Sequence, residues 1–142
     1  MPALTSAEAR ERFAAARVAH LATADTEGRP HLVPVVFAVD GDTVMLVVDH
    51  KPKRTTRLKR LANIAANPSV CLLTDHYEED WDCLWWARAD GTARVLPPPD
   101  RFSEAARGIG LLTAKYRQYA DRPPDGPVVE VSVLRWSGWR AS

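Results

Sequence analysis

Short apolar runs separated by turn-forming residues fill most of the first third of the chain after its N-terminal segment. Val, Leu, Ala and Phe dominate these runs, whereas Gly, Asp and Pro lie between them. This pattern is typical of β-strands joined by tight hairpins, and Asp40-Gly41 is a hairpin signal of its own. Pro34 suits only an edge strand or a bulge, because Pro has no N–H to donate to a ladder. We therefore expect three consecutive antiparallel strands, at residues 18–23, 31–39 and 43–49.

The same alternation of apolar runs and turns continues further along the chain. Asp90-Gly91 lies between two apolar runs and is a second hairpin signal. A Pro triplet at residues 97–99 ends the later of these two runs. The further strands that we expect are residues 69–74, 84–89, 92–96 and 128–133, with residues 134–140 offering one more.

Three segments have the character of helices instead. Thr5 and Glu8 fit a capping box at the start of the Ala-rich segment 5–17, in which Phe13 is the main apolar anchor. A second amphipathic segment covers residues 100–119.

The third helical segment is residues 52–66, which Asn67-Pro68 terminates. The 3.6-residue period of a helix places the apolar positions of this segment on one face, which we expect to be buried. These positions are Leu58, Leu61, Ala62 and Ala65.

Many short strands with two or three helices favour an antiparallel barrel over an alternating βαβ fold. A chain of 142 residues, 46% of them hydrophobic, is long enough for one domain with one core. The expected fold is α+β and mainly antiparallel β, in a single domain over residues 1–142.

Basic residues gather at the start of the third helical segment. Six of the nineteen Lys and Arg residues fall within residues 51–60, directly after an apolar run. Helical spacing places Lys53, Arg57 and Arg60 together, while Arg54 lies close to the apolar stripe. Anions are favoured at helix N-termini, because unpaired backbone N–H groups and the helix dipole add to the side-chain charge. This segment therefore predicts a site for a small, multiply charged anion, although a solvated helix face is the alternative.

The charge of the whole chain argues against a nucleic-acid partner. The formal net charge is only +1, and an acidic stretch between residues 75 and 82 follows the basic one. A nucleic-acid-binding domain normally has a surplus of positive charge on one face. We expect a small molecule as the partner and no nucleic acid.

Metal and membrane sites are not expected either. Cys71 and Cys83 lack the spacing of a metal or redox motif, and the four histidines are scattered. The acidic residues 78–80 are adjacent in a loop and indicate a solvated turn. No segment approaches eighteen consecutive apolar residues, and no signal peptide is recognisable, so we expect a cytoplasmic protein with no membrane partner.

The central segment carries a resemblance to a known family. Its residues are Asp49-His50-Lys51-Pro52-Lys53, Arg60-Leu61-Ala62-Asn63-Ile64, Asn67-Pro68, Asp75-His76-Tyr77-Glu78-Glu79-Asp80-Trp81 and Leu84-Trp85-Trp86. With the order of elements, they make the chain similar to the pyridoxamine 5′-phosphate oxidase-like split β-barrels, in particular to the branch that uses the deazaflavin coenzyme F420. The resemblance implies a six- to seven-stranded split β-barrel and a homodimer with cofactor sites at the interface.

The resemblance also implies which residues hold the cofactor. Its ring would lie along the strands near Pro34, Val35 and Val48. Its phosphate would lie near Lys51, Lys53, Arg54, Thr55 and Arg60. This chain has more residues between Lys51 and Asn63 than the shorter family members, so the main phosphate contact would come either from Lys53 and Thr55 or from Arg60. One of the three neighbouring tryptophans could form a wall for the ring, since Trp85 and Trp86 point to opposite faces of a strand. The full set of expected cofactor-binding residues is Pro34, Val35, Val48, Asp49, Lys51, Lys53, Arg54, Thr55, Arg60 and Trp86.

The function that follows is an F420-dependent oxidoreductase. The reduced deazaflavin would deliver a hydride from its C5 to an unidentified small-molecule acceptor, so no catalytic acid or base needs to be visible in the sequence. Two alternatives remain open: an FMN-dependent oxidoreductase of the same fold, and a non-catalytic protein that binds a flavin or a tetrapyrrole. Arg140 near the C-terminus is a further candidate, because in related flavin enzymes such an Arg can reach the substrate or cofactor across the dimer.

Overall fold

One seven-stranded antiparallel sheet forms the framework of the computed structural model, in the order β2-β1-β5-β6-β7-β4-β3. The structure describes residues 3–48, 54–100 and 102–142, and for residues 54–58 it describes the backbone only. The strands are β1 (Ala19–Ala24), β2 (Pro30–Val35), β3 (Phe37–Asp40), β4 (Thr43–Val47), β5 (Ser69–His76), β6 (Trp85–Val95) and β7 (Val128–Arg140).

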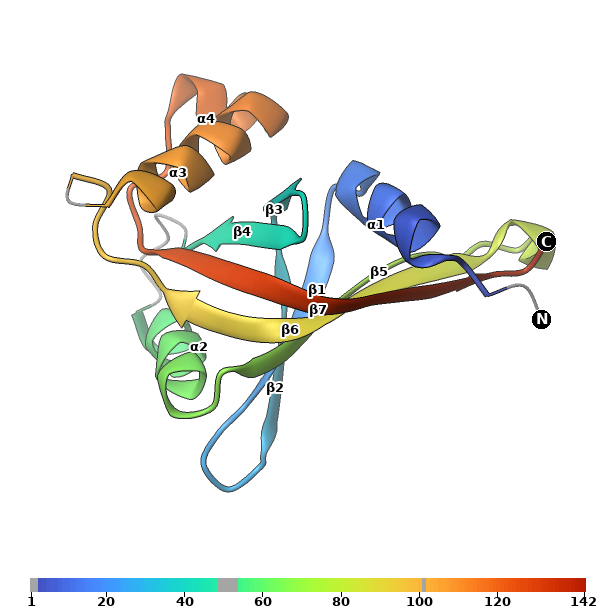
Figure 1. Ribbon diagram of the computed structural model, residues 1–142, viewed down its shortest axis with the longest axis horizontal. Helices are drawn as coiled ribbons and strands as arrows, with labels where there is room; N and C mark the ends of the chain where they lie inside the picture. The colour runs from blue at the N-terminus through green and yellow to red at the C-terminus, as the bar shows by residue number, and fades with distance from the viewer. Residues whose placement is uncertain (1–2, 49–53, 101) are drawn as a thin grey trace.

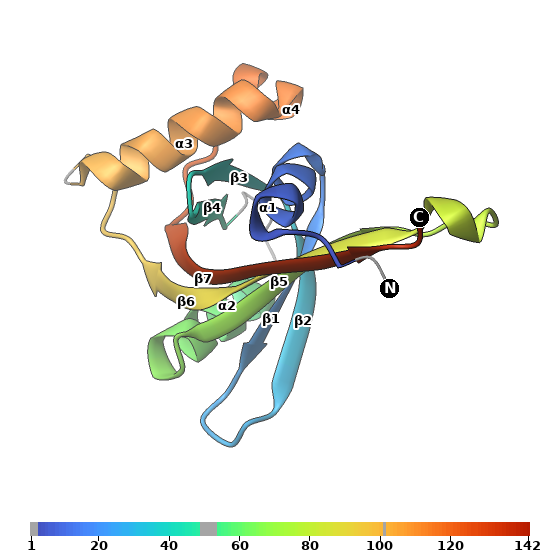
Figure 2. The ribbon, with the colours of Figure 1, turned by 45° about the vertical axis from the view of Figure 1, so that its right-hand side comes forward.

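The chain itself forces this sheet to curl. β2 and β3 are the two edges of the sheet, yet Val36 alone separates them in sequence. Because consecutive Cα atoms are 3.8 Å apart, the two edges must meet at this residue. The sheet bends round on itself as a split β-barrel, as Figure 1 and Figure 2 show. The expected α+β split barrel is therefore confirmed.

Four helices and one short 3-10 turn accompany the sheet. They are α1 (Ser6–Ala15), α2 (Arg54–Ala66), η1 (Trp81–Cys83), α3 (Ser103–Lys115) and α4 (Arg117–Asp121). The expected capping box is present on α1: the Thr5 hydroxyl accepts from the N–H of Glu8, and the Glu8 carboxylate accepts from the N–H of Thr5. Within the described ranges, no helix combines the length and the apolar character needed to cross a membrane.

The core lies inside the curl of the sheet. The strand register aligns Leu21, Leu72, Ala89 and Trp136 in one row, and all four side chains are buried. α1 covers this row from one end, because the ring of Phe13 lies 4.8 Å from that of Phe37 and 5.4 Å from that of Trp136. A second apolar cluster lies beneath α3, around Leu112 and neighbouring residues.

The hairpin expected at Asp90-Gly91 is wrong. β6 runs without interruption through these residues, and the register against β7 shifts between them as in a β-bulge. A Cβ on Gly91 would lie 2.2 Å from the carbonyl oxygen of Ser132, so this position requires glycine for close approach of two backbones. The Asp-Gly pair therefore marks an irregularity within a strand and not a reversal of the chain.

Three further boundaries differ from expectation. The run 31–39 is divided at Val36 between two strands at opposite edges of the sheet, where Pro34 takes the predicted edge position. Residues 128–140 form one strand, because β7 pairs with β6 from Val129 to Arg140 and with β4 from Val128 to Ser132. The helix expected at residues 100–119 breaks at Tyr116, whose extended backbone separates α3 from α4.

The end of the β5–β6 hairpin extends beyond the barrel as an arm. It carries η1 at its tip, and the C-terminal part of β7 runs beside it, as both ribbon views show. Trp81 at this tip is 73% exposed. The tip of the arm lies well away from α2, which packs against the barrel (Figure 1).

Candidate functional site

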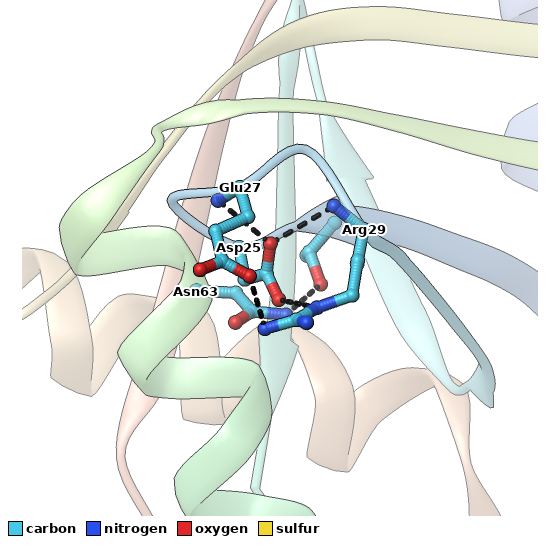
Figure 3. Close-up of polar contacts among 5 residues, drawn as sticks. Asp25, Glu27, Arg29 and Asn63 are labelled. Carbon is cyan, nitrogen blue, oxygen red and sulfur yellow. Dashed lines mark hydrogen bonds and ion pairs between the residues drawn. The ribbon is translucent and has the colours of Figure 1, made fainter.

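α2 closes one end of the barrel, and a buried polar pair fixes it there. The Asn63 side-chain amide donates a hydrogen bond of 3.1 Å to the hydroxyl of Thr23 on β1. Both residues are buried, at 5% and 4% exposure, and Ile64 beside them belongs to the core. Figure 3 shows Asn63 next to the turn between β1 and β2. The direction in which α2 presents its side chains is therefore set by a specific contact.

This buried face of α2 is not the one expected from hydrophobic periodicity. Ala62 and Ala65 are exposed, while Asn63 and Ile64 are buried and Leu61 packs only partly against the core. The side chain of Leu58 lies outside the described residues. The helix is rotated because the hydroxyl of Thr23 offers a partner for Asn63, which an apolar count cannot reveal.

Arg60 lies one turn before Asn63 on the same side of α2. Its side chain is half-buried, and burial lowers the pKa of its guanidinium. The Nε atom is shielded from solvent and has no hydrogen-bond partner among the described residues. A buried donor without a partner is destabilising and uncommon, so a bound ligand that offers an acceptor to the Nε–H of Arg60 would be favoured there.

His31 on β2 presents a second unpartnered nitrogen nearby. Its Nδ1 atom is shielded and unpaired within the described part of the chain. Burial, and then the charges of Lys59 and Arg60, lower the pKa of the imidazole. The region between β2 and α2 therefore has net positive character, and the residues present fit an oxyanion such as the phosphate of a cofactor.

Trp86 lies at a different place, on the outer face of the sheet. A hollow of about 370 Å³ is formed there by Leu73, Asp75, Tyr77, Trp86 and Arg88. The guanidinium of Arg88 lies 5.4 Å from the centre of the Trp86 ring, and its Nε donates to Asp90 at 3.0 Å. Trp85 points to the opposite face and packs against the core, as strand alternation predicts.

The other expected ring contacts differ in their exposure. Pro34 is exposed on the edge strand, so its ring and backbone are accessible. Val35 and Val48 are buried, at 7% and 1% exposure, so only their backbone could face a ligand. The N–H of Val48 donates to the carbonyl of Pro127, which anchors the chain just before the basic segment.

Part of the expected phosphate site lies outside the described residues. This applies to Asp49, Lys51 and Lys53, and to the side chains of Arg54 and Thr55, whose backbone belongs to the first turn of α2. Arg60 is the expected phosphate ligand whose side chain is described. Arg140 lies at the end of β7, opposite Trp85 and far from α2 along the strand.

Trp86 lies far along β6 from the point where the chain leaves α2. Ala93 of β6 donates a backbone hydrogen bond to Pro68, just after α2, and Trp86 lies seven residues away on the same strand. At about 3.3 Å per residue, Ala93 and Trp86 are roughly 23 Å apart. Trp86 lies on the outer face of the sheet, whereas Asn63 of α2 bonds to Thr23 on the inner face.

Two of the acidic residues expected to form a solvated turn lie together with Cys83 and His76 at the tip of the arm, a grouping that the sequence did not indicate. Donor atoms of Glu78, Asp80 and Cys83 are within 4.8 Å of one another, and the imidazole of His76 bonds to Glu78. All of these side chains are exposed. We assign no cation to them, because exposed acidic groups commonly gather without one. The pKa of the Cys83 thiol is raised, by desolvation and then by the neighbouring Asp80 and Glu78.

Comparison with known proteins agrees with this architecture. The family model described as pyridoxamine 5′-phosphate oxidase matches residues 5–140. A FAD-binding protein from Mesorhizobium loti has a TM-score of 0.76 and 20% identity, covering 99% of this chain and 98% of its own. The FAD binding protein from Mycobacterium smegmatis has a TM-score of 0.65 and 18% identity, covering 99% of this chain and 98% of its own.

A third solved structure bears a different name. The heme storage protein HutZ from Vibrio cholerae has a TM-score of 0.69 and 15% identity, covering 94% of this chain and 92% of its own. Among curated proteins, none matches the sequence. At these identities the solved structures show a shared fold, whereas the family match extends over nearly the whole sequence. The chain belongs to the pyridoxamine 5′-phosphate oxidase family, whose fold is that of flavin-binding oxidoreductases.

Proposed function

We propose that the protein is an F420-dependent reductase that passes a hydride from the deazaflavin to a small-molecule acceptor. The observation that carries this proposal is the half-buried guanidinium of Arg60, whose Nε has no partner among the described residues, at the end of a segment with six basic residues in ten. FMN carries one phosphate, for which one or two basic groups suffice. Coenzyme F420 adds an oligoglutamyl tail to its phosphate, and a longer basic segment suits this larger anion.

The residues of this chain would contribute binding and orientation. When bound, the deazaflavin supplies the hydride chemistry itself. Arg60 would hold the phosphate, since its Nε lacks another acceptor among the described residues. Pro34 would offer the ring a flat, exposed surface without an N–H donor. Exclusion of water and fixed placement of the ring would then account for the contribution of the protein to the rate.

We further propose that the protein acts as a homodimer with its cofactor sites at the interface. Trp86 lies on the outer face of the sheet, whereas α2 is anchored to Thr23 on the inner face, so a site that contains both Trp86 and Arg60 would draw them from two copies. Large apolar side chains are exposed on the outer side of the molecule, including Leu32 and Tyr77 at 65% each. Such residues favour association with another surface. The prediction is a particle of twice the 15.8 kDa chain mass in analytical ultracentrifugation.

Two other functions have specific support. FAD or FMN as the cofactor is favoured by the FAD-binding proteins among the structural neighbours. A non-catalytic role is favoured by the heme storage protein, which has the same fold. The three candidates differ in which ligand binds tightly and whether a bound ligand reacts.

A direct titration separates these candidates. F420, FMN, FAD and heme would each be titrated into the wild type, into Arg60→Gln and into the exposed-arginine control Arg122→Gln. We expect F420 to bind most tightly. Loss of a charge-assisted hydrogen bond of about 1.5–3 kcal/mol in Arg60→Gln should weaken it roughly 10- to 100-fold, with Arg122→Gln unchanged.

The remaining outcomes each select another function. If FMN or FAD bound more tightly than F420, that flavin would be assigned as the cofactor. If heme alone bound, the storage role would be favoured. If F420 binds, its reduced form should be oxidised rapidly with some acceptor in a stopped-flow screen. If F420 bound tightly but transferred no hydride to any of a broad set of acceptors, the protein would be assigned as a non-catalytic F420-binding protein.

A further inference from the structure

His31 faces the inside of the barrel next to α2. In β2 the side chains alternate, and His31 pairs with Thr23 of β1, whose side chain is buried on the inner face. The hydroxyl of Thr23 accepts from Asn63, and Asn63 lies three residues after Arg60 on α2. Since residues three apart are neighbours on a helix, this chain of contacts places His31 and Arg60 at the same end of the barrel.

Both residues have a buried nitrogen that lacks a partner. Within the residues that the structure describes, neither His31 Nδ1 nor Arg60 Nε makes a hydrogen bond, although each is shielded from solvent. Buried polar atoms are almost always paired with protein or with a bound group. Two such atoms, on groups close enough for the charge of Arg60 to act on His31, point to an oxyanion as the missing acceptor.

The surroundings of His31 favour the neutral form of its imidazole. Burial is the main cause of its lowered pKa, followed by Lys59 and Arg60 of α2. The charged residues of the adjoining β1–β2 turn are engaged with one another: Arg29 binds both Asp25 and Glu27, as Figure 3 shows. Among the described residues, no carboxylate forms an ion pair with His31.

We propose that His31 is the proton-binding member of an anion site shared with Arg60, so that an oxyanion bound there is taken up together with one proton. An anion next to the imidazole favours its charged form, and Nδ1–H then becomes a donor with an acceptor. The negative charge also offsets the repulsion from Lys59 and Arg60. This deepens the proposed function, on which it rests for the carrier of the oxyanion, a phosphorylated cofactor.

Sulfate is a suitable probe, because it remains a dianion over the range in which histidine titrates. Its affinity would be measured by calorimetry from pH 5.5 to 8.5 at constant ionic strength, for the wild type, His31→Gln and Arg60→Gln. His76→Gln is the matched control, since that histidine lies in the arm. In parallel, NMR of the wild type would follow the His31 ring with and without sulfate, which requires no variant.

We expect the affinity of the wild type to fall as the pH rises, by up to about tenfold per pH unit, the limit for uptake of one proton. His31→Gln should remove this slope and His76→Gln should keep it, whereas Arg60→Gln should bind weakly at every pH. The NMR titration should show sulfate raising the pKa of His31.

Three results would overturn the inference: no sulfate binding, a flat pH profile in the wild type, or an unchanged slope in His31→Gln. These results are independent of F420. Proton-linked sulfate binding without F420 binding would refute the proposed cofactor and leave the anion site standing, whereas F420 binding without sulfate binding or proton linkage would do the reverse.

Discussion

At the scale of single residues, Arg60 and His31 each have a buried nitrogen without a hydrogen-bond partner among the described residues. Lys115 has hydrogen-bond partners but is half-buried at the end of α3. Its pKa falls to about 8, mainly by desolvation and then by the charge of Arg17. Its Nζ donates to the carbonyl of Ala14 at 3.2 Å and lies 3.8 Å from the centre of the Phe37 ring.

The lowered pKa of Lys115 predicts a stability that increases with pH. Between pH 8 and 10.5 the unfolded chain holds a proton on this amine that the folded chain has lost, so stability rises with pH in that window. After a discount for solvent screening, the gain is on the order of 1–2 kcal/mol. The measurement is urea unfolding from pH 7.5 to 9.5, compared with Lys115→Met.

The comparison with Lys115→Met also removes other titrations. The pKa values of Cys71 and Tyr116 are raised by burial, and both groups contribute in the opposite direction at high pH. They remain in the variant and cancel in the difference. Equal pH slopes for the two proteins would show that Lys115 keeps an ordinary pKa in the folded state.

At the scale of elements, the same sequence signal gives different structures at different positions in the sheet. An Asp-Gly pair forms a hairpin turn between two short strands. Asp90-Gly91 instead forms a bulge, because β5 and β7 both pair with β6 on either side of it. The β3–β4 hairpin was predicted correctly, because Asp40-Gly41 lies between two short strands. The rotation of α2 escaped prediction because one buried hydrogen bond to Thr23 outweighed a weak apolar stripe.

The end of β4 depends on a close approach that only glycine permits. A Cβ on Gly126 would lie 1.8 Å from the carbonyl oxygen of Val48, the last described residue before the basic segment. Gly126→Ala should therefore displace that strand end and destabilise the fold by about 1–3 kcal/mol. It should also weaken cofactor binding, because the basic segment 51–60 begins three residues after Val48.

Gly110→Ala provides the matched control for this prediction. A Cβ there meets nothing within 4 Å, and the residue is exposed in α3, so the substitution should stabilise the helix by up to about 1 kcal/mol. Thermal unfolding and ligand titration of both variants check the prediction. Wild-type stability and binding in Gly126→Ala would refute the idea that this contact positions the basic segment.

At the scale of the whole molecule, closure of the sheet leaves one barrel end for α1 and the other for α2. α1 has little apolar surface of its own, and Phe13 supplies most of its contact with the barrel. This ring contacts Phe37 of β3 and Trp136 of β7, two strands that are far apart in the sequence. A single side chain thus links distant parts of the chain.

Replacement of this ring should weaken the whole fold. Phe13→Ala removes a fully buried aromatic side chain and should lower the free energy of unfolding by about 3–5 kcal/mol. Leu134→Ala is the control, because Leu134 is 77% exposed and its loss should change stability by less than about 0.5 kcal/mol. Urea unfolding of both variants measures the difference, and a small effect of Phe13→Ala would mean that α1 contributes little to the core.

The sequence alone determined the strands as short apolar runs, the capped first helix, the basic segment and the family resemblance, because local pattern and residue type carry this information. The tertiary structure decided the rest. It showed that the two edge strands β2 and β3 follow one another at Val36, that His31 lies opposite the buried Thr23 to which α2 bonds, and that Trp86 faces the outer side of the sheet. These are relations between residues distant in sequence, and they depend on strand register and helix rotation, which no local pattern encodes.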